Sequence, residues 1–89
     1  MVARVFVSGY VHGVGYRQFV KEIAKEHGLK GWVKNLPDGR VQAEFYGQKE
    51  RIEEAIERLW KGTFLSKVRN INIEWVKKGQ VHDEFNIIH

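Results

Sequence analysis

The spacing of the apolar residues changes repeatedly along this 89-residue chain, and these changes restrict the folds that it can form. Residues 3–11 alternate between apolar and polar, as in a strand with one buried face. Residues 16–27 instead repeat their apolar side chains at i, i+3, i+4 and i+7, as in an amphipathic helix. Strand patterns return at residues 30–35, after Gly39 and at 69–77, a second helix is predicted near 49–61, and a short final strand includes Phe85 and Ile87.

Two local patterns refine this prediction. Leu36-Pro37-Asp38-Gly39 is a strong turn signal, because Pro presets one backbone angle and Gly accepts a positive φ. The strands on either side of so short a turn are expected to form a hairpin. The second helix is expected to bury one apolar stripe, formed by Ile52, Ala55, Ile56, Leu59 and Trp60.

The elements follow the order β-α-β-β-α-β with one extra strand, which is the order of the ferredoxin-like plait. We therefore predict an α+β fold in which two helices pack on one face of a mainly antiparallel sheet, with one extra short strand. The pattern does not show which of the last two strands is the extra one. The length suits one domain, so residues 1–89 are expected to form a single domain.

The composition argues against several kinds of site. The chain has no cysteine, which excludes disulfides, thiolate nucleophiles and cysteine-based zinc sites. Its four histidines, at positions 12, 27, 82 and 89, are scattered, and no Asp/Glu pair accompanies them at ligand spacing, which argues against a two-metal phosphatase site. No apolar run approaches the ~20 residues of a membrane span. We therefore expect no membrane partner and, by default, a cytoplasmic location.

The start of the first helix is unusual in its charge and in its capping. No Ser, Thr, Asp or Asn precedes it to cover the unpaired N–H groups of its first turn. Arg17 lies at the positive end of the helix dipole, which disfavours a cation by roughly 0.3–1 kcal/mol. The second helix has the normal arrangement, with Glu50 early and Lys61 late. A bound anion would explain both anomalies, and the predicted phosphate-sized site consists of His12, Gly13, Val14, Gly15, Tyr16 and Arg17.

An alternative interpretation is that Gly13 and Gly15 only make a tight turn and that Arg17 faces solvent. The net charge of +4 favours an anionic partner, but the basic and acidic residues of the chain are interleaved, which is also typical of a solvated surface.

The chemistry that remains for an anion site here is catalysis by positioning and electrostatics. The loop has no cysteine nucleophile and lacks the Gly-Lys-Ser/Thr ending of a nucleotide-binding loop. Phosphoryl transfer would then need a side chain that holds the attacking water in line. Asn35 is the candidate, because the first two strands of a β-α-β unit run parallel and end at the same edge. Asn35 can also be read as a turn residue, and His12 either as a nucleophile or general acid or as a loop residue.

These residues resemble the acylphosphatase family over the whole chain. The resemblance is carried by the segments Gly9-Tyr10-Val11-His12-Gly13-Val14-Gly15-Tyr16-Arg17, Gly28-Leu29-Lys30-Gly31-Trp32-Val33-Lys34-Asn35 and Asp38-Gly39-Arg40-Val41, and by Gly47. It implies hydrolysis of an acyl phosphate to a carboxylate and inorganic phosphate, without metal, cofactor or phosphoenzyme. It also implies that Arg17 and the loop amides bind the phosphate and that Asn35 orients the attacking water.

The chain departs from the family pattern at three places. His12 stands where the family usually has Gln, Tyr16 where it often has Phe, and Leu36 where a Thr or Ser often follows the asparagine. Neither predicted catalytic position, Arg17 or Asn35, is changed. The zinc-binding cysteines and further domains of the larger carbamoyl-transfer proteins are missing, so we expect a stand-alone enzyme.

Two other functions are compatible with the predicted fold. An RNA-binding module has the same element order, and Phe6 and Tyr10 on the first strand suit it. The strand after Gly39 lacks the Lys/Arg-Gly-Phe motif of such modules, so no nucleic-acid partner is expected. A domain that binds an anion without hydrolysing a substrate is the other alternative. The pattern indicates neither the natural substrate nor the oligomeric state.

Overall fold

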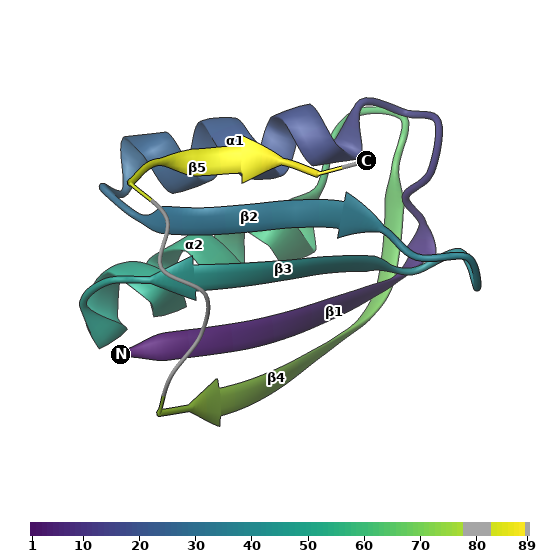
Figure 1. Ribbon diagram of the computed structural model, residues 1–89. Helices are drawn as coiled ribbons and strands as arrows, with labels where there is room; N and C mark the ends of the chain where they lie inside the picture. Colours follow the sequence, from purple (N-terminus) through teal and green to yellow (C-terminus); the bar gives the residue numbers. More distant parts are fainter. Residues whose placement is uncertain (78–82, 89) are drawn as a thin grey trace.

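The computed structural model describes residues 1–77 and 83–88, which contain five strands and two helices (Figure 1). The predicted elements are confirmed, with boundaries that differ by at most two residues where a range was predicted. His82 and His89, which were considered as metal ligands, lie outside the described residues. In chain order the elements are β1 (Val2–Tyr10), α1 (Tyr16–Glu26), β2 (Lys30–Asn35), β3 (Val41–Tyr46), α2 (Lys49–Lys61), β4 (Lys67–Val76) and β5 (Phe85–Ile87).

The sheet has the strand order β4-β1-β3-β2-β5. β1 pairs antiparallel with β3 and β4, and β2 pairs antiparallel with β3, so β1 and β2 run in the same direction. β5 pairs parallel with the outer edge of β2. The predicted plait is thereby confirmed, and β5 is identified as the extra strand. Both β1 and β2 end at the edge of the sheet where α1 begins (Figure 1).

Both helices cover one face of the sheet and bury their apolar stripes against it (Figure 1). The largest fully buried side chains include Tyr16 and Ile23 of α1, Ile52 and Leu59 of α2, and Phe45 of β3. Neither helix in the described part of the chain is long and apolar enough to cross a membrane.

The prediction that Trp60 belongs to the buried stripe of α2 is wrong, because 46% of its surface is exposed. Trp60 follows Ile52 by eight positions, so its side chain is rotated by about 80° around the helix axis from that of Ile52 and lies at the margin of the stripe. On β4, Ile71 is buried, but Ile73 and Trp75 are 41% and 40% exposed. β4 is an edge strand among the described strands, so these side chains have a neighbouring strand on one side of β4 only.

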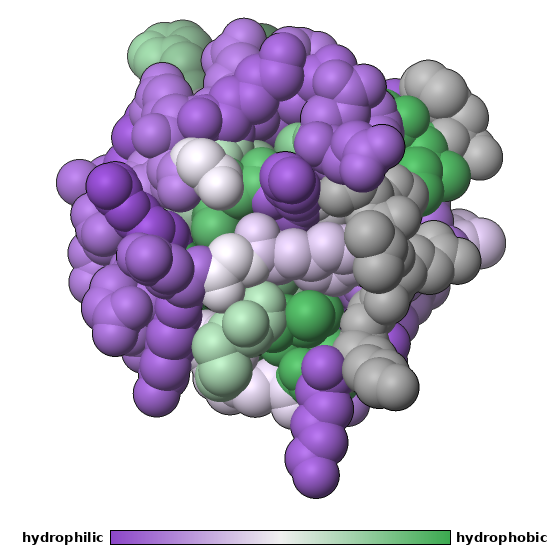
Figure 2. Space-filling model, turned by 60° about the vertical axis from the view of Figure 1, so that its left-hand side comes forward, coloured by the Kyte–Doolittle hydropathy of each residue, from purple (hydrophilic) through white to green (hydrophobic). Residues whose placement is uncertain are grey.

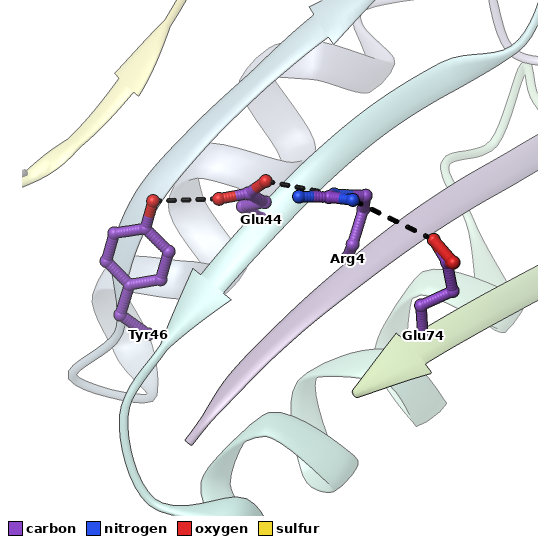
Figure 3. Close-up of polar contacts among 4 residues, drawn as sticks. All are labelled: Arg4, Glu44, Tyr46 and Glu74. Carbon is purple, nitrogen blue, oxygen red and sulfur yellow. Dashed lines mark hydrogen bonds and ion pairs between the residues drawn. The ribbon is translucent and has the colours of Figure 1, made fainter. Parts of the chain in front are cut away.

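The opposite face of the sheet carries a polar network across three strands (Figure 3). Glu44 of β3 is only 4% exposed. It accepts hydrogen bonds from Nε of Arg4 at 3.1 Å and from the hydroxyl of Tyr46 at 2.8 Å, and Arg4 also lies 4.0 Å from Glu74. Arg4 is the direct cross-strand partner of both glutamates, so the network favours this strand register. The alternating pattern of β3 did not indicate that Glu44 would be buried.

The face of the molecule shown in Figure 2 is mainly hydrophilic, with smaller groups of hydrophobic residues among the charged and polar ones. This distribution suits a domain in which charged residues make up 29% of the sequence.

Candidate active site

Residues 11–15 connect the end of β1 to the start of α1, and two glycines shape this connection. Gly13 and Gly15 have φ values of 70° and 74°, in the left-handed region that favours glycine. Gly15 is the N-cap of α1, and no side chain in the described part of the chain caps the helix there. The first helical hydrogen bond runs from the N–H of Phe19 to the carbonyl of Gly15, at 3.1 Å. The N–H groups before Phe19 in this turn therefore have no partner within the helix.

A comparison with α2 shows which features of the start of α1 are unusual in this protein. The predicted charge pattern of α2 is confirmed, with Glu50 in its first turn and Arg58 and Lys61 in its last. Among the described residues, however, α2 also lacks a side-chain cap, since Gln48 makes no capping hydrogen bond. A missing cap alone thus does not mark an anion site. The distinguishing features of α1 are its two left-handed glycines and a first turn with Arg17 and no acidic residue.

A cavity of about 200 Å³ lies at this helix start. It brings Arg17, on the first turn of α1, together with Asn35, the last residue of β2. The two strands that position these residues are parallel but not adjacent, since β3 lies between them. The cavity is lined by Val11, Gly13, Gly15, Tyr16, Arg17, Gln18, Asn35 and Ile87.

Asn35 lines this cavity and has an unsatisfied polar atom in its side chain. Its side-chain oxygen Oδ1 is buried and has no hydrogen-bond partner among the described residues. A buried acceptor without a partner costs about 1–3 kcal/mol, so such atoms in native proteins usually bond to water or ligand. The backbone beside it is well fixed, because the N–H of Leu36 donates to the carbonyl of Arg40 at 2.8 Å in the β2–β3 hairpin.

Tyr16 has a structural side chain, although the residue lines the cavity. The side chain is 1% exposed, and its hydroxyl donates to the carbonyl of Leu59 in α2 at 2.9 Å. Burial raises the pKa of this hydroxyl above its ordinary value. Because the hydroxyl is bonded in the core, the backbone N–H is the group through which Tyr16 can serve an anion.

Two of the predicted loop residues lie outside the lining of the cavity. Val14 packs against the hydrophobic core. Nε2 of His12 lies 2.9 Å from the carbonyl oxygen of Arg40, in the β2–β3 hairpin. His12 therefore contacts the part of the chain that carries Asn35, a placement that no sequence pattern indicated.

Three lining residues were missed by the sequence analysis, namely Val11, Gln18 and Ile87. Val11 and Gln18 flank the predicted segment, so extending that segment by one residue on each side would have found them. Ile87 lies on β5, and its place beside the loop depends on β5 being next to β2, which the periodicity left open.

Comparisons with known proteins agree on one family. The acylphosphatase family profile matches residues 3–87. The chain is 42% identical over 71 residues to an acylphosphatase of Syntrophobacter fumaroxidans, covering 80% of this chain and 73% of that one. It is 36% identical over 86 residues to an acylphosphatase of a Roseiflexus species, covering 97% and 92% of the two chains. The crystal structure of acylphosphatase from Bacillus subtilis matches with a TM-score of 0.95 and 36% identity, over 100% of both chains.

Proposed function

This chain belongs to the acylphosphatase family, and we propose that its hydrolase activity on acyl phosphates resides in the cavity between Arg17 and Asn35. The single observation that carries this assignment is the placement of both residues on one cavity, where Oδ1 of Asn35 is buried without a partner in the described chain. The site would need no cofactor, because the loop, Arg17 and Asn35 supply both anion binding and water positioning.

The first task of the site is to bind the phosphoryl group. In a loose transition state the negative charge is spread over the equatorial phosphoryl oxygens. The N–H groups at the start of α1 and the guanidinium of Arg17 would donate to these oxygens, and the helix dipole would add to the attraction. Gly13 and Gly15 have no Cβ, and apart from their chain neighbours no described residue lies within 4 Å of where one would be, which keeps the approach to the loop open.

The second task is to place water opposite the leaving group. Oδ1 of Asn35 would accept one hydrogen of the attacking water, and a lone pair of that water would then face phosphorus. The bond from the water oxygen to phosphorus forms while the bond from phosphorus to the acyl oxygen breaks, and the carboxylate leaves with the electron pair. A phosphoryl oxygen takes the proton of the water. A carboxylate is a good leaving group, so this scheme requires no general acid from the protein.

Three further expectations accompany this proposal. Inorganic phosphate, one of the products, should itself bind in the cavity as an anion. Residues 1–89 would act as one acylphosphatase domain. The cytoplasmic location remains a prediction from sequence.

The test is hydrolysis of a simple aryl acyl phosphate, with EDTA present throughout. We expect turnover that EDTA does not change, and a fall of about 10²–10³-fold in kcat for Asn35→Ala, the range found for loss of one preorganised polar group. The affinity for inorganic phosphate should stay close to that of the wild type, because Asn35 holds water and not the phosphate. Asn72→Ala, at an exposed position on β4, is the matched control.

Two outcomes would contradict the assignment. Near-wild-type turnover by Asn35→Ala would place the water elsewhere. A folded protein that binds phosphate but shows no turnover would be an anion-binding domain.

A further inference from the structure

One backbone carbonyl in the β2–β3 hairpin accepts two hydrogen bonds from different parts of the site. The carbonyl oxygen of Arg40 accepts the N–H of Leu36 at 2.8 Å, which closes the hairpin directly after Asn35. The same oxygen lies 2.9 Å from Nε2 of His12, which belongs to the loop before α1. These two contacts join the loop of the phosphate site to the backbone that carries the water-binding side chain.

The chemistry of this contact fixes the state of His12. A carbonyl oxygen can only accept, so Nε2 of His12 must carry the hydrogen and donate it. The donor and acceptor are 28 residues apart in the sequence, and the ladder between β1 and β3 has already ended at the pair Val7–Val41. The His12 contact therefore connects two segments beyond the end of the sheet pairing that holds them.

We propose that His12 is a positioning residue, which keeps Asn35 in register with the phosphate loop through the carbonyl of Arg40. This inference rests on the proposed function, because it assumes that Asn35 holds the attacking water. In this role His12 contacts neither the water nor the phosphate. Its hydrogen bond only fixes the position of the loop relative to the hairpin.

The hairpin turn is also fixed by contacts of its own, and the guanidinium of Arg40 stacks on the ring of Phe6 in β1, 4.9 Å from its centroid. Asp38 accepts the backbone N–H of Arg40 at 3.0 Å and Nε of the same residue at 2.8 Å. The N–H of Gly39 donates to the carbonyl of Leu36 at 3.1 Å. The turn is thus internally braced and would move as a unit if the His12 contact were lost.

The proposal predicts which side chains can replace His12. Nε2 of glutamine has the same bond separation from Cβ as Nε2 of histidine and carries N–H donors, whereas the amide of asparagine is one bond shorter. Glutamine should therefore reach the carbonyl of Arg40, and asparagine and alanine should not. This relation also accounts for His12 at a position where glutamine is usual in the family.

The experiment compares kcat, KM for an aryl acyl phosphate and the dissociation constant of inorganic phosphate in three variants. His12→Ala and His12→Asn should lower kcat by about tenfold. This loss is smaller than the roughly 10²-fold that a 1 Å misplacement of a catalytic group can cost. KM and phosphate affinity should change by less than about twofold, because the loop itself is intact. His12→Gln should restore most of the lost kcat.

A matched control is available in His27, at the opposite end of α1. Its Nδ1 lies 2.8 Å from the carbonyl of Ile23, so it is also a half-buried imidazole on a backbone oxygen. His27→Ala should leave kcat unchanged. Thermal unfolding of His12→Ala and His27→Ala then separates lost stability from lost positioning.

Coupling to Asn35 decides the mechanism. In the Asn35→Ala background, His12→Ala should cause no further loss of kcat, because no positioned water remains to be misplaced. A full additional loss in that background would overturn the proposal, as would an unchanged kcat in His12→Ala. Activity of His12→Gln as low as that of His12→Ala would also overturn it, since that pattern indicates proton transfer by the imidazole. Failure of the proposed function is distinct, because it would appear as high turnover in Asn35→Ala alone.

Discussion

Replacing Tyr16 with phenylalanine removes a single oxygen atom from the core and tests how the helix that carries Arg17 is held. The ring keeps its volume and its contact with Phe19, whose centroid is 5.6 Å away, so the change creates no large cavity. The hydroxyl contact with the carbonyl of Leu59 is lost. That carbonyl belongs to the last turn of α2, where the helix supplies no N–H partner of its own.

The magnitude follows from the burial of both partners. An ordinary hydrogen bond contributes about 0.5–1.5 kcal/mol net, but a buried acceptor left without a donor costs about 1–3 kcal/mol. Leu59 is fully buried, so the larger range applies. For a domain of this size each kcal/mol shifts Tm by roughly 4–8 °C, which gives a decrease on the order of 10 °C for Tyr16→Phe.

The assay is denaturant and thermal unfolding followed by circular dichroism at neutral pH. Tyr10→Phe is the control, because Tyr10 is 62% exposed and its substitution should change the free energy of unfolding by less than about 0.5 kcal/mol. An unchanged slope of free energy against denaturant would show that the loss arises in the folded state. If Tyr16→Phe lost no more stability than Tyr10→Phe, the assignment of Tyr16 as the anchor between the helices would be refuted.

Alkaline pH provides a second measurement on the same residue. Burial raises the pKa of Tyr16 in the folded state above the value of 10.0 for a free tyrosine. Its contribution is therefore fully present below pH 10 and is lost as the pH rises, because the unfolded chain then releases the proton more readily. Tyr16→Phe cannot ionise, so part of the alkaline loss of stability should disappear in this variant.

Three further predictions concern the site and the sheet. Arg17→Ala should weaken binding of inorganic phosphate by about 10–150-fold, equivalent to a charged hydrogen bond of roughly 1.5–3 kcal/mol. Calorimetry measures the two affinities, with Arg51→Ala at an exposed position as the control, and equal affinities in the two variants would remove Arg17 from the site. Burial, with a further contribution from hydrogen bonding to Glu44, raises the pKa of Tyr46 to about 12. Unfolding titrations of the wild type should therefore show stability present below pH 10 and lost toward pH 12, with a smaller loss in Tyr46→Phe. Gly31→Ala should lower the free energy of unfolding by about 2–4 kcal/mol in denaturant, because φ is 137° and a Cβ would meet the carbonyl oxygen of Glu44. Gly39→Ala is the control, since its φ is 96° but a Cβ there would enter open space, and it should cost only about 1 kcal/mol.

The architecture was predictable because each element has a period of its own. Alternation in β1 and β3 and the helical repeat in α1 and α2 follow directly from which side chains face the core. The Pro37–Gly39 turn identified the β2–β3 hairpin. Trp60 and β5 depended on what lies beside them in space, and a local pattern carries no such information. The ends of a stripe and the edges of a sheet are therefore the places where the prediction was wrong or incomplete.

The candidate site was only partly predictable. Arg17 stood out because a cation at a helix start opposes the dipole, and Asn35 because parallel strands end at the same edge. Their roles in catalysis stay predictions, although the structure places both on one cavity. The contacts of His12 with Arg40 and of Tyr16 with Leu59 join residues that are 28 and 43 positions apart, and nothing in the local sequence specifies such pairings.

The position of β3 between β1 and β2 has a consequence for the order in which a newly made molecule becomes active. β1, which leads into the loop before Arg17, and β2, which ends at Asn35, meet only through β3. β1 must also pair with β4, which is distant in the sequence. Contacts between distant residues form slowly, whereas helices form locally and fast. During refolding, the circular-dichroism signal of the helices should therefore recover before the enzyme activity. The recovered activity would be proportional to the fraction of molecules in which the central strands have paired.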